Sequence, residues 1–456
     1  DAATKGIDLK TALRNYEGNT ANSIAKKVSN VVFGLNETYA SIADSYTGTL
    51  VDIEQDVDVH AYYIQENGTY TVYFLANGTI YSPANSADLY ANMGALVEVD
   101  THNYDVSRVE TMSNMFLNCG QLAVMDTSDW NTANVNNMYQ TFRNCNTLVA
   151  EVGTWDVSNV TNMYAMFAYN YALTELDVSN WQVGKVEDMA AMFAYSYNLE
   201  YLDVSKWDTG SVKTFKAMFQ GRQNTGNMKI NNLDVSNWDT SSCTIMNHMF
   251  YSCGSLTSLN SGNWDVSNVT TMSHMFADCH SVEVIDVSGW NPSSCVDFDG
   301  TFNDCWSLKE LDTSGWDTGS AVTLAQMFEG CGDLKTIKGI EDWDVSKVVS
   351  VNEMFYTNGQ SMGIEELDLS GWNTASLTNT GRMFMGCGML TTVYVGDGWN
   401  LSQVTESGSM FTWCEKLIGG QGTTVANMKT DDATYACADG GVDAPGYLTY
   451  KAAQKP

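Results

Sequence analysis

The sequence is poor in basic residues. It has 22 Lys and Arg against 54 Asp and Glu, so its formal net charge is −32, yet only 17% of its residues are charged. Binding to phosphate groups needs clustered basic charge, so we expect no nucleic acid and no anionic membrane among the partners. No run approaches the roughly 18 apolar residues of a membrane-spanning helix, so no transmembrane segment is predicted. With 44% hydrophobic residues, the chain is predicted to fold.

Recognisable catalytic and cofactor motifs are also missing. The sequence contains no C-x-x-C pair, which argues against a zinc site. It contains no G-x-S-x-G, H-E-x-x-H or P-loop string. A pair of carboxylates for glycoside hydrolysis is an alternative among 54 acids, but the acids recur at regular intervals instead of clustering once. The sequence therefore predicts a protein that is not an enzyme and has no catalytic or cofactor-binding residues.

One spacing recurs through most of the sequence: a Trp is followed twelve residues later by a Phe. Tyr104 and Phe116 make a first copy, with Tyr in the Trp position. The Phe-to-Phe step is 25 to 31 residues, and all the length variation lies between Phe and the next Trp. These twelve copies predict a repeat array instead of the several domains that length alone suggests. The other copies begin at Trp130, Trp155, Trp181, Trp207, Trp238, Trp264, Trp290, Trp316, Trp343, Trp372 and Trp399.

The clearest copy of the unit, LTELDVSNWQVGKVEDMAAMFAYS, begins at Leu173. Its first seven residues alternate apolar and polar, which predicts a strand. Val186, Met189, Met192 and Phe193 then fall at i, i+3, i+6 and i+7, which predicts a short helix of about two turns. One strand and one short helix per repeat are typical of an α/β leucine-rich-repeat solenoid, in which each unit buries its apolar edge against its neighbours.

The strings LDVSNWDT (233–240) and VTTMSHMFADCHSV (269–282) closely resemble the 26-residue repeat of BspA-like leucine-rich-repeat bacterial surface proteins, a family also found among mycoplasma surface lipoproteins. The ending TDDATYACADGGVDAPGYLTY (430–450) is similar to the closing segment common after such arrays. The resemblance implies a right-handed solenoid, and it implies a secreted or surface-displayed protein, often an adhesin. It supplies no catalytic residues.

The ends of the array differ from the repeat. Residues 1–60 form a separate N-terminal segment, an anchoring or assembly module. One or two amphipathic helices, interrupted near Gly18, are predicted from the spacing of Leu9, Leu13, Ile24, Val28, Val31 and Val32. Residues 47–59 are a candidate strand. Residues 61–98 combine a β-hairpin, marked by two Asn-Gly turn signals, with a half-repeat whose Tyr90 occupies the Phe position. Residues 99–420 form the solenoid. Residues 421–456 form a C-terminal cap, with a last strand at 447–450.

The cysteines and the large apolar residues occupy fixed repeat positions. Eight of the eleven cysteines lie three residues after the repeat Phe, which favours small buried thiols over a disulfide framework or a metal ladder. The Trp, Met and Phe columns favour core packing over a ligand groove. We expect each buried Trp to pack edgewise on its neighbours and its N–H to find a partner. The predicted structural core includes Trp181, Trp207, Trp264, Phe193, Phe219, Phe276, Cys253, Cys279 and Cys305.

Aspartates form two repeated columns, four residues before the Trp and directly after it. Calcium prefers carboxylate and carbonyl oxygens, so Asp177, Asp203, Asp234, Asp208, Asp239 and Asp265 are candidate Ca²⁺ ligands, and calcium is the one candidate cofactor. The favoured interpretation is different: these side chains cap the amides of turns, because Asn replaces Asp freely after the Trp. His248 and His274 share one position in adjacent repeats and form a weaker two-histidine candidate, stacked on an exposed helix face.

These features predict a non-enzymatic extracellular protein of the cell surface. It would adhere to a partner, a protein or a glycan on a host or neighbouring cell, through an extended solenoid face. The alternative is a self-assembling structural subunit, a homo-oligomer or polymer of a surface filament or sheath, in which residues 1–60 dock on a neighbouring copy.

Overall fold

The computed structural model describes residues 7–14, 24–51, 53–146, 151–223, 226–358 and 362–452. The chain divides into two compact units, Asp1–Val212 and Lys213–Pro456, which are considered separately below. Both contain the predicted repeat, built mainly of short strands, isolated bridges and turns, with little helix.

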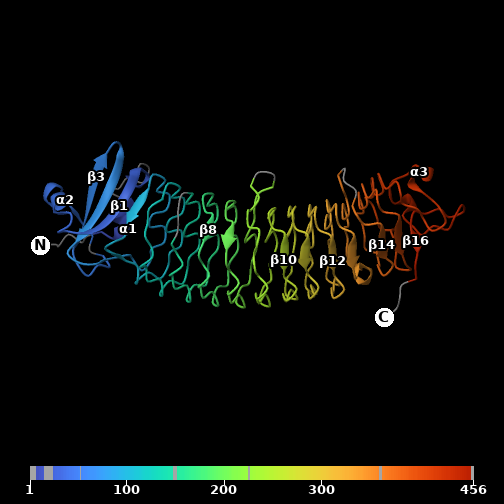
Figure 1. Cartoon of the computed structure of the whole chain (residues 1–456), viewed down its shortest axis with the longest axis horizontal. Helices are drawn as coiled ribbons and strands as arrows, with labels where there is room; N and C mark the ends of the chain where they lie inside the picture. The colour runs from blue at the N-terminus through green and yellow to red at the C-terminus, as the bar shows by residue number, and fades with distance from the viewer. Residues whose placement is uncertain are drawn as a thin grey trace. The chain divides into compact units, whose positions relative to one another are not determined.

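The first unit begins with a five-stranded sheet (Figure 1). Its strand order is β2-β3-β4-β1-β6, so strands from residues 1–60 and from 61–98 fold together. The predicted hairpin is confirmed: β3 and β4 pair antiparallel around Asn67 and Gly68, which both have positive φ, as a tight two-residue hairpin turn requires. The strands are β1 (Val28–Leu35), β2 (Thr49–Val51), β3 (Val59–Glu66), β4 (Thr69–Ala76) and β6 (Glu98–Asp100); β5 (Ile80–Tyr81) pairs separately with β7 (Tyr104–Asp105).

The helices predicted before this sheet are only partly present. α1 (Leu9–Arg14) buries Leu9 and Leu13 as expected. A helix through Val28, Val31 and Val32 is wrong, because this stretch forms β1 after the short 3-10 helix η2 (Ile24–Lys27). Three β-branched valines favour a strand in the centre of a sheet, and pairing with both β4 and β6 outweighs the helical spacing. A second helix, α2 (Ala40–Ser45), was not predicted. The expected interruption at Gly18 lies outside the described residues.

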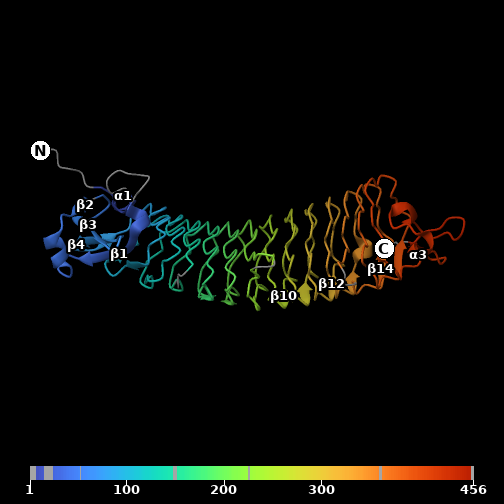
Figure 2. The same ribbon diagram turned by 90° about the horizontal axis from the view of Figure 1, so that it is seen from above.

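α1 also covers the first half-repeat (Figure 2). In the next repeats of the first unit, backbone carbonyls near the repeat Phe accept amides from the preceding repeat, but the half-repeat that contains Tyr90 has no preceding repeat. The Lys10 ammonium donates to the carbonyl oxygen of Ala87, and the Arg14 guanidinium donates to that of Ala91 at 2.9 Å. Two basic side chains therefore satisfy acceptors that would otherwise lack a partner.

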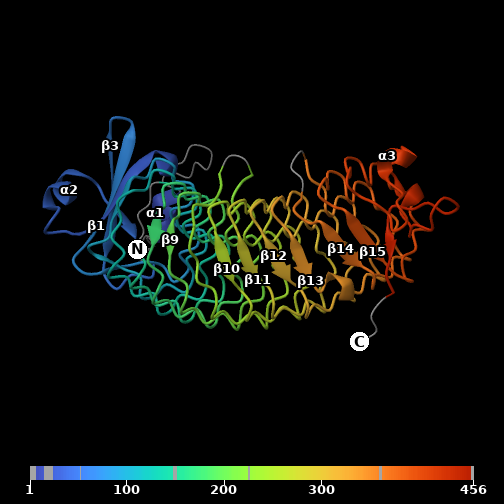
Figure 3. The same cartoon turned by 45° about the vertical axis from the view of Figure 1, so that its right-hand side comes forward.

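The repeats pair in parallel through strands shorter than predicted. In the first unit, β8 (Glu175–Leu176) pairs with β9 (Tyr201–Leu202). In the second unit, successive strands point the same way (Figure 3) and form the pairs β10-β11 and β12-β13 and the trio β14-β15-β16. Their bounds are β10 (Ser258–Asn260), β11 (Val284–Asp286), β12 (Glu310–Asp312), β13 (Thr336–Lys338), β14 (Glu366–Leu369), β15 (Thr392–Val395) and β16 (Thr449–Tyr450).

The short helix predicted in each repeat is wrong. The segment from Met112 to Asn118 is a series of turns in which Asn114 and Asn118 have φ of 55° and 60°. Its amides alternate: Asn114 and Phe116 donate to the next repeat, whereas Met115 and Leu117 donate three residues back. The same left-handed position recurs two residues before every repeat Phe. Turns bonded to i−3 also satisfy the i, i+3 spacing, and two turns of helix are too short to be stable alone.

The core consists of columns of identical side chains. Phe250 and Phe276 stack with ring centroids 5.5 Å apart and an interplanar angle of 2°. Trp rings also stack nearly parallel, as between Trp264 and Trp290 at 7°, so the edgewise packing predicted for Trp is wrong. Because neighbouring repeats are related by a constant translation, equivalent rings in the same rotamer lie parallel. The predicted partner is present for Trp264, whose Nε1–H donates to the carbonyl oxygen of Val235 at 3.0 Å, but the buried Nε1–H of Trp130 has no partner among the described residues.

The predicted C-terminal strand is confirmed, because β16 pairs in parallel with β15. Before it lie α3 (Val425–Met428) and two 3-10 helices, η3 (Ile340–Asp342) inside the repeats and η4 (Ala433–Tyr435) in the cap. Tyr447 packs edge-on against Phe411, the last repeat Phe, with ring centroids 5.2 Å apart. The Phe411 amide donates to the carbonyl oxygen of Asp431 instead of to a further repeat. The cap thus ends both the aromatic column and its hydrogen bonds.

Candidate binding surfaces

The residues predicted for the structural core lie inside the two units. Trp181, Trp207 and Phe193 are buried in the first unit, and the others are buried in the second: Phe219, Trp264, Phe276, Cys253, Cys279 and Cys305. All eleven cysteines are free thiols, and ten are buried. Burial raises the pKa of the Cys279 thiol to about 12, so it remains a protonated hydrogen-bond donor. These columns build the scaffold and offer no reactive group.

The candidate calcium ligands accept hydrogen bonds from their own turns. Asp177, Asp203 and Asp234 each accept the backbone amide and the hydroxyl of the Ser two residues later. Asp208, Asp239 and Asp265 each accept the amide two residues later. Asn131, Asn373 and Asn400 accept the same amide from the same position. Among the described residues, no group of three or more His, Cys, Asp or Glu could hold a metal ion.

The two histidines predicted to share one face do stack. The rings of His248 and His274 lie 5.3 Å apart at 10°. They occupy the left-handed turn position, with φ of 59° and 53°, and not a helix. Burial, followed by the charge of His274, lowers the pKa of His248 to about 4. His248 is therefore neutral at physiological pH and packs as an aromatic ring.

Six tyrosines, which sequence reasoning did not single out, form a surface on three adjacent repeats of the first unit. We call Tyr139, Tyr164, Tyr169, Tyr171, Tyr195 and Tyr197 the tyrosine patch. Equivalent rings stack between repeats, with centroids 4.6 Å apart for Tyr169 and Tyr195 and 5.4 Å for Tyr171 and Tyr197. Tyr169 and Tyr171 of one repeat meet nearly at right angles, at 82°.

The tyrosine patch rests on small residues. Ala165, Ala168 and Ala194 are buried, and Tyr164, Tyr169 and Tyr195 pack against them. The Arg143 guanidinium lies 4.9 Å from the centre of the Tyr169 ring, and Tyr171 is 39% exposed. Because ring faces cover one another, the patch presents ring edges and hydroxyls. Aromatic groups of this amphipathic kind are enriched in the centre of binding surfaces.

In the second unit, Trp306 is one of the exposed aromatic residues, at 46%. Its ring stacks on His280, with centroids 3.8 Å apart, and its Nε1–H donates to Asp304 Oδ1 at 3.0 Å. Acidic side chains gather nearby: burial, followed by the charges of Glu353 and Asp304, raises the pKa of Glu329 to about 7. The Glu329 carboxyl is therefore easily protonated near neutral pH.

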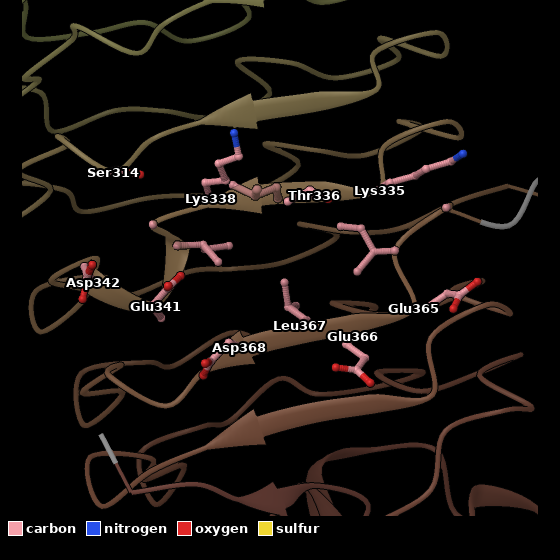
Figure 4. Close-up of a pocket in the computed structure, with 15 residues that line it drawn as sticks. Ser314, Lys335, Thr336, Lys338, Glu341, Asp342, Glu365, Glu366, Leu367 and Asp368 are labelled. Carbon is pink, nitrogen blue, oxygen red and sulfur yellow. The ribbon is translucent and has the colours of Figure 1, made fainter. Parts of the chain in front are cut away.

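A cleft of about 720 Å³ opens on the strand face of the second unit, between β13 and β14 (Figure 4). Ile337, Ile340, Ile364 and Leu367 line it and are buried. Its charged groups come from the two strands, from the residue directly before each strand and from η3. Lys335 and Lys338 lie on one wall, Glu365, Glu366 and Asp368 on the other, and Glu341 and Asp342 at one end. The Lys338 ammonium lies 3.7 Å from Asp312 Oδ2.

The repeats match one protein family, described as "Mycoplasma protein of unknown function, DUF285". Five overlapping matches lie at 85–200, 119–231, 169–281, 222–337 and 296–419. Together they span residues 85–419, well over half of the chain. The chain belongs to the DUF285 family. No curated protein matches it. In the described portion of this DUF285 chain, no helix is long and apolar enough to cross a membrane.

One sequence signal could have found some of these surfaces in the DUF285 repeats. Eleven of the thirteen Trp follow the repeat, and the two that do not are Trp306 and Trp413. Both are exposed, at 46% and 55%, whereas the repeat Trp are buried wherever a core column continues past them. A Trp outside its core column thus marks a surface position. No aromatic residue marks the cleft in the sequence. Its one sequence feature is the longer step of 29 residues between Phe355 and Phe384.

Proposed function

We propose that this DUF285 protein is a non-enzymatic extracellular protein of the cell surface, built as a right-handed BspA-like leucine-rich-repeat solenoid, which binds a protein or glycan of another cell. The tyrosine patch carries this proposal. Phe, Met, Trp and Cys fill the core columns, whereas the six tyrosines lie outside those columns and occur together on three adjacent repeats. Tyr combines a large apolar ring with a hydroxyl and two side-chain torsions, which suits it to recognition surfaces.

The test is binding of labelled protein to panels of glycans and extracellular proteins and to whole cells. The patch variant replaces Tyr169, Tyr171, Tyr195 and Tyr197 by Ala, and the control replaces Tyr201, which is 76% exposed outside the patch. We expect the patch variant to lose at least about tenfold in affinity for the selected ligand, since central aromatic residues dominate binding energy. The control should bind as the native protein does. Equal binding by all three proteins, with unchanged melting temperatures, would contradict the proposal.

A self-assembling subunit remains the second candidate, and it has less support. It needs residues 1–60 to dock on another copy, yet β1 and β2 of this segment pair in the chain's own sheet. α1 likewise satisfies carbonyls of the chain's own first half-repeat. Gel filtration across concentrations and negative-stain imaging distinguish the two candidates. Regular fibres would favour the filament, and a monomer at every concentration would exclude it.

A further inference from the structure

In the part of the chain that the structure describes, the strands on either side of the cleft each lack one neighbour. There, β13 pairs with β12 alone, and β14 pairs with β15 alone. Within the described residues, no backbone hydrogen bond joins β13 to β14. The backbone groups of a strand point alternately to its two sides, so both walls of the cleft present donors and acceptors that a strand could use. These groups need a partner, and water supplies it when no other chain does.

The separation has a local cause. The repeat that contains β13 continues into η3, and the next repeat carries extra residues before β14. The side chains of Ile340 and Ile364, contributed by these extra segments, are buried between the two strands. The repeats meet again beyond the cleft, where Trp372 Nε1–H donates to the carbonyl oxygen of Ile340 at 2.8 Å. This bond closes one end of the opening.

The charges around the cleft select the side chains of an occupant. Five carboxylates line it against two ammonium groups. Both lysines belong to the β13 side, whereas Glu366 and Asp368 project from β14 (Figure 4). Thr336, Lys338 and Glu366 are exposed, and Ile337 and Leu367 are buried beneath them. On its outer side an inserted strand would thus lie between Lys338 of β13 and Glu366 of β14, because Asp368 is already paired with Lys451, and on its inner side it would meet apolar groups.

We propose that this cleft accepts an extended peptide of a partner protein as an added strand between β13 and β14. Main-chain hydrogen bonds to both walls would hold it, as in other cases of strand addition. Its outward side chains are basic and face Glu365 and Glu366, and its inward side chains are apolar and lie on Ile337 and Leu367. The site consists only of residues of the second unit and is separate from the tyrosine patch, so either can fail without the other.

The experiment measures binding of the capped peptide Lys-Val-Lys-Val-Lys-Val to the full chain by calorimetry. Two matched peptides separate the contributions: Glu-Val-Glu-Val-Glu-Val reverses the charge, and alternate N-methylation of the Lys-Val peptide removes amide donors but keeps the charge. We expect both to bind at least about tenfold more weakly. Absence of binding by the Lys-Val peptide, or equal binding by its N-methylated form, would overturn the proposal.

A pair of protein variants locates the site. Glu366→Lys reverses a charge on β14, and Glu175→Lys makes the same change at the equivalent position of β8 in the first unit. Both glutamates are exposed, so neither change should disturb the core. We expect E366K to weaken binding of the Lys-Val peptide at least about tenfold and E175K to leave it unchanged. Equal effects of the two variants would show diffuse attraction to an acidic chain and would refute a site in the cleft.

Discussion

The thiol of Cys279 donates a hydrogen bond to the carbonyl oxygen of Phe250, 3.1 Å away in the preceding repeat. The same bond recurs along the column, for example from Cys305 to Phe276. In two of the four repeats that lack Cys, the replacement keeps a donor: Asn170 donates to the Phe142 carbonyl oxygen at 2.9 Å, and the Ser196 hydroxyl to that of Phe167 at 2.7 Å. The other two have the exposed residues Arg222 and Asn358, so a small donor is what the buried form of this position contains.

This bond predicts how Cys279 tolerates replacement. C279A removes one of two hydrogen bonds to the Phe250 carbonyl oxygen, which also accepts the Cys253 amide at 3.0 Å, and should destabilise the protein by about 0.5–1.5 kcal/mol. C279S restores a donor, as Ser196 shows, and should be more stable than C279A. Thermal unfolding of the two variants checks the order. A serine variant less stable than the alanine variant would mean that the column selects apolar volume and not a donor.

The left-handed turn before each Phe predicts an unusual response to glycine. Ala191 has φ of 55°, where a Cβ is strained, so A191G should stabilise the protein by roughly 1 kcal/mol. In a helix, the same change would destabilise by about 0.5–1 kcal/mol. The sign of the change in melting temperature therefore distinguishes a left-handed turn from a helix at Ala191. A lower melting temperature for A191G than for the native protein would indicate a helix.

The raised pKa of Glu329 predicts that replacing its carboxyl stabilises the protein at high pH and not at low pH. Its folded pKa is raised to about 7 by burial and by neighbouring carboxylates, so the unfolded chain loses its proton more readily. Stability from this group is present below the unfolded pKa, near 4.5, and is lost as pH rises through about 7. E329Q should therefore melt at a higher temperature than the native protein at pH 8 and at nearly the same temperature at pH 4.5. A gain that does not depend on pH would contradict this origin.

The aspartates after the Trp predict no dependence on calcium. Asp239 accepts a turn amide, as Asn131 does from the equivalent position, so D239N should change the free energy of unfolding by less than about 0.5 kcal/mol. EDTA or added Ca²⁺ should leave the melting temperature of both proteins unchanged. A rise with Ca²⁺ that D239N reduces would instead assign a cation to this column.

The position of each residue within the repeat could be predicted from the sequence, because the same residue types recur at fixed intervals. A Trp and a Phe twelve residues apart identify the columns, and Cys279 or Trp264 is buried because every neighbour repeats the same pattern. The hairpin of β3 and β4 was equally predictable, since Asn67 and Gly68 favour the positive φ that its turn needs.

The remaining features depend on contacts between repeats. Whether Met112–Asn118 forms a helix or turns depends on carbonyl groups of the next repeat, about 25 residues away, that accept alternate amides. Whether Val28–Val32 is helix or strand depends on pairing with β4 and β6. Local spacing does not encode such distant partners, and the i, i+3 pattern fits both outcomes.

The shortage of Lys and Arg, the twelve copies and the core columns were determined by the sequence alone, because identical units can bury their apolar edges only on one another. Tertiary structure alone decided where that regularity breaks. Stacking brings Tyr169 and Tyr195 together into a surface, and a few extra residues before Glu366 separate β13 from β14 and open a cleft. Both depend on the fixed distance between neighbouring repeats, which three-dimensional packing sets.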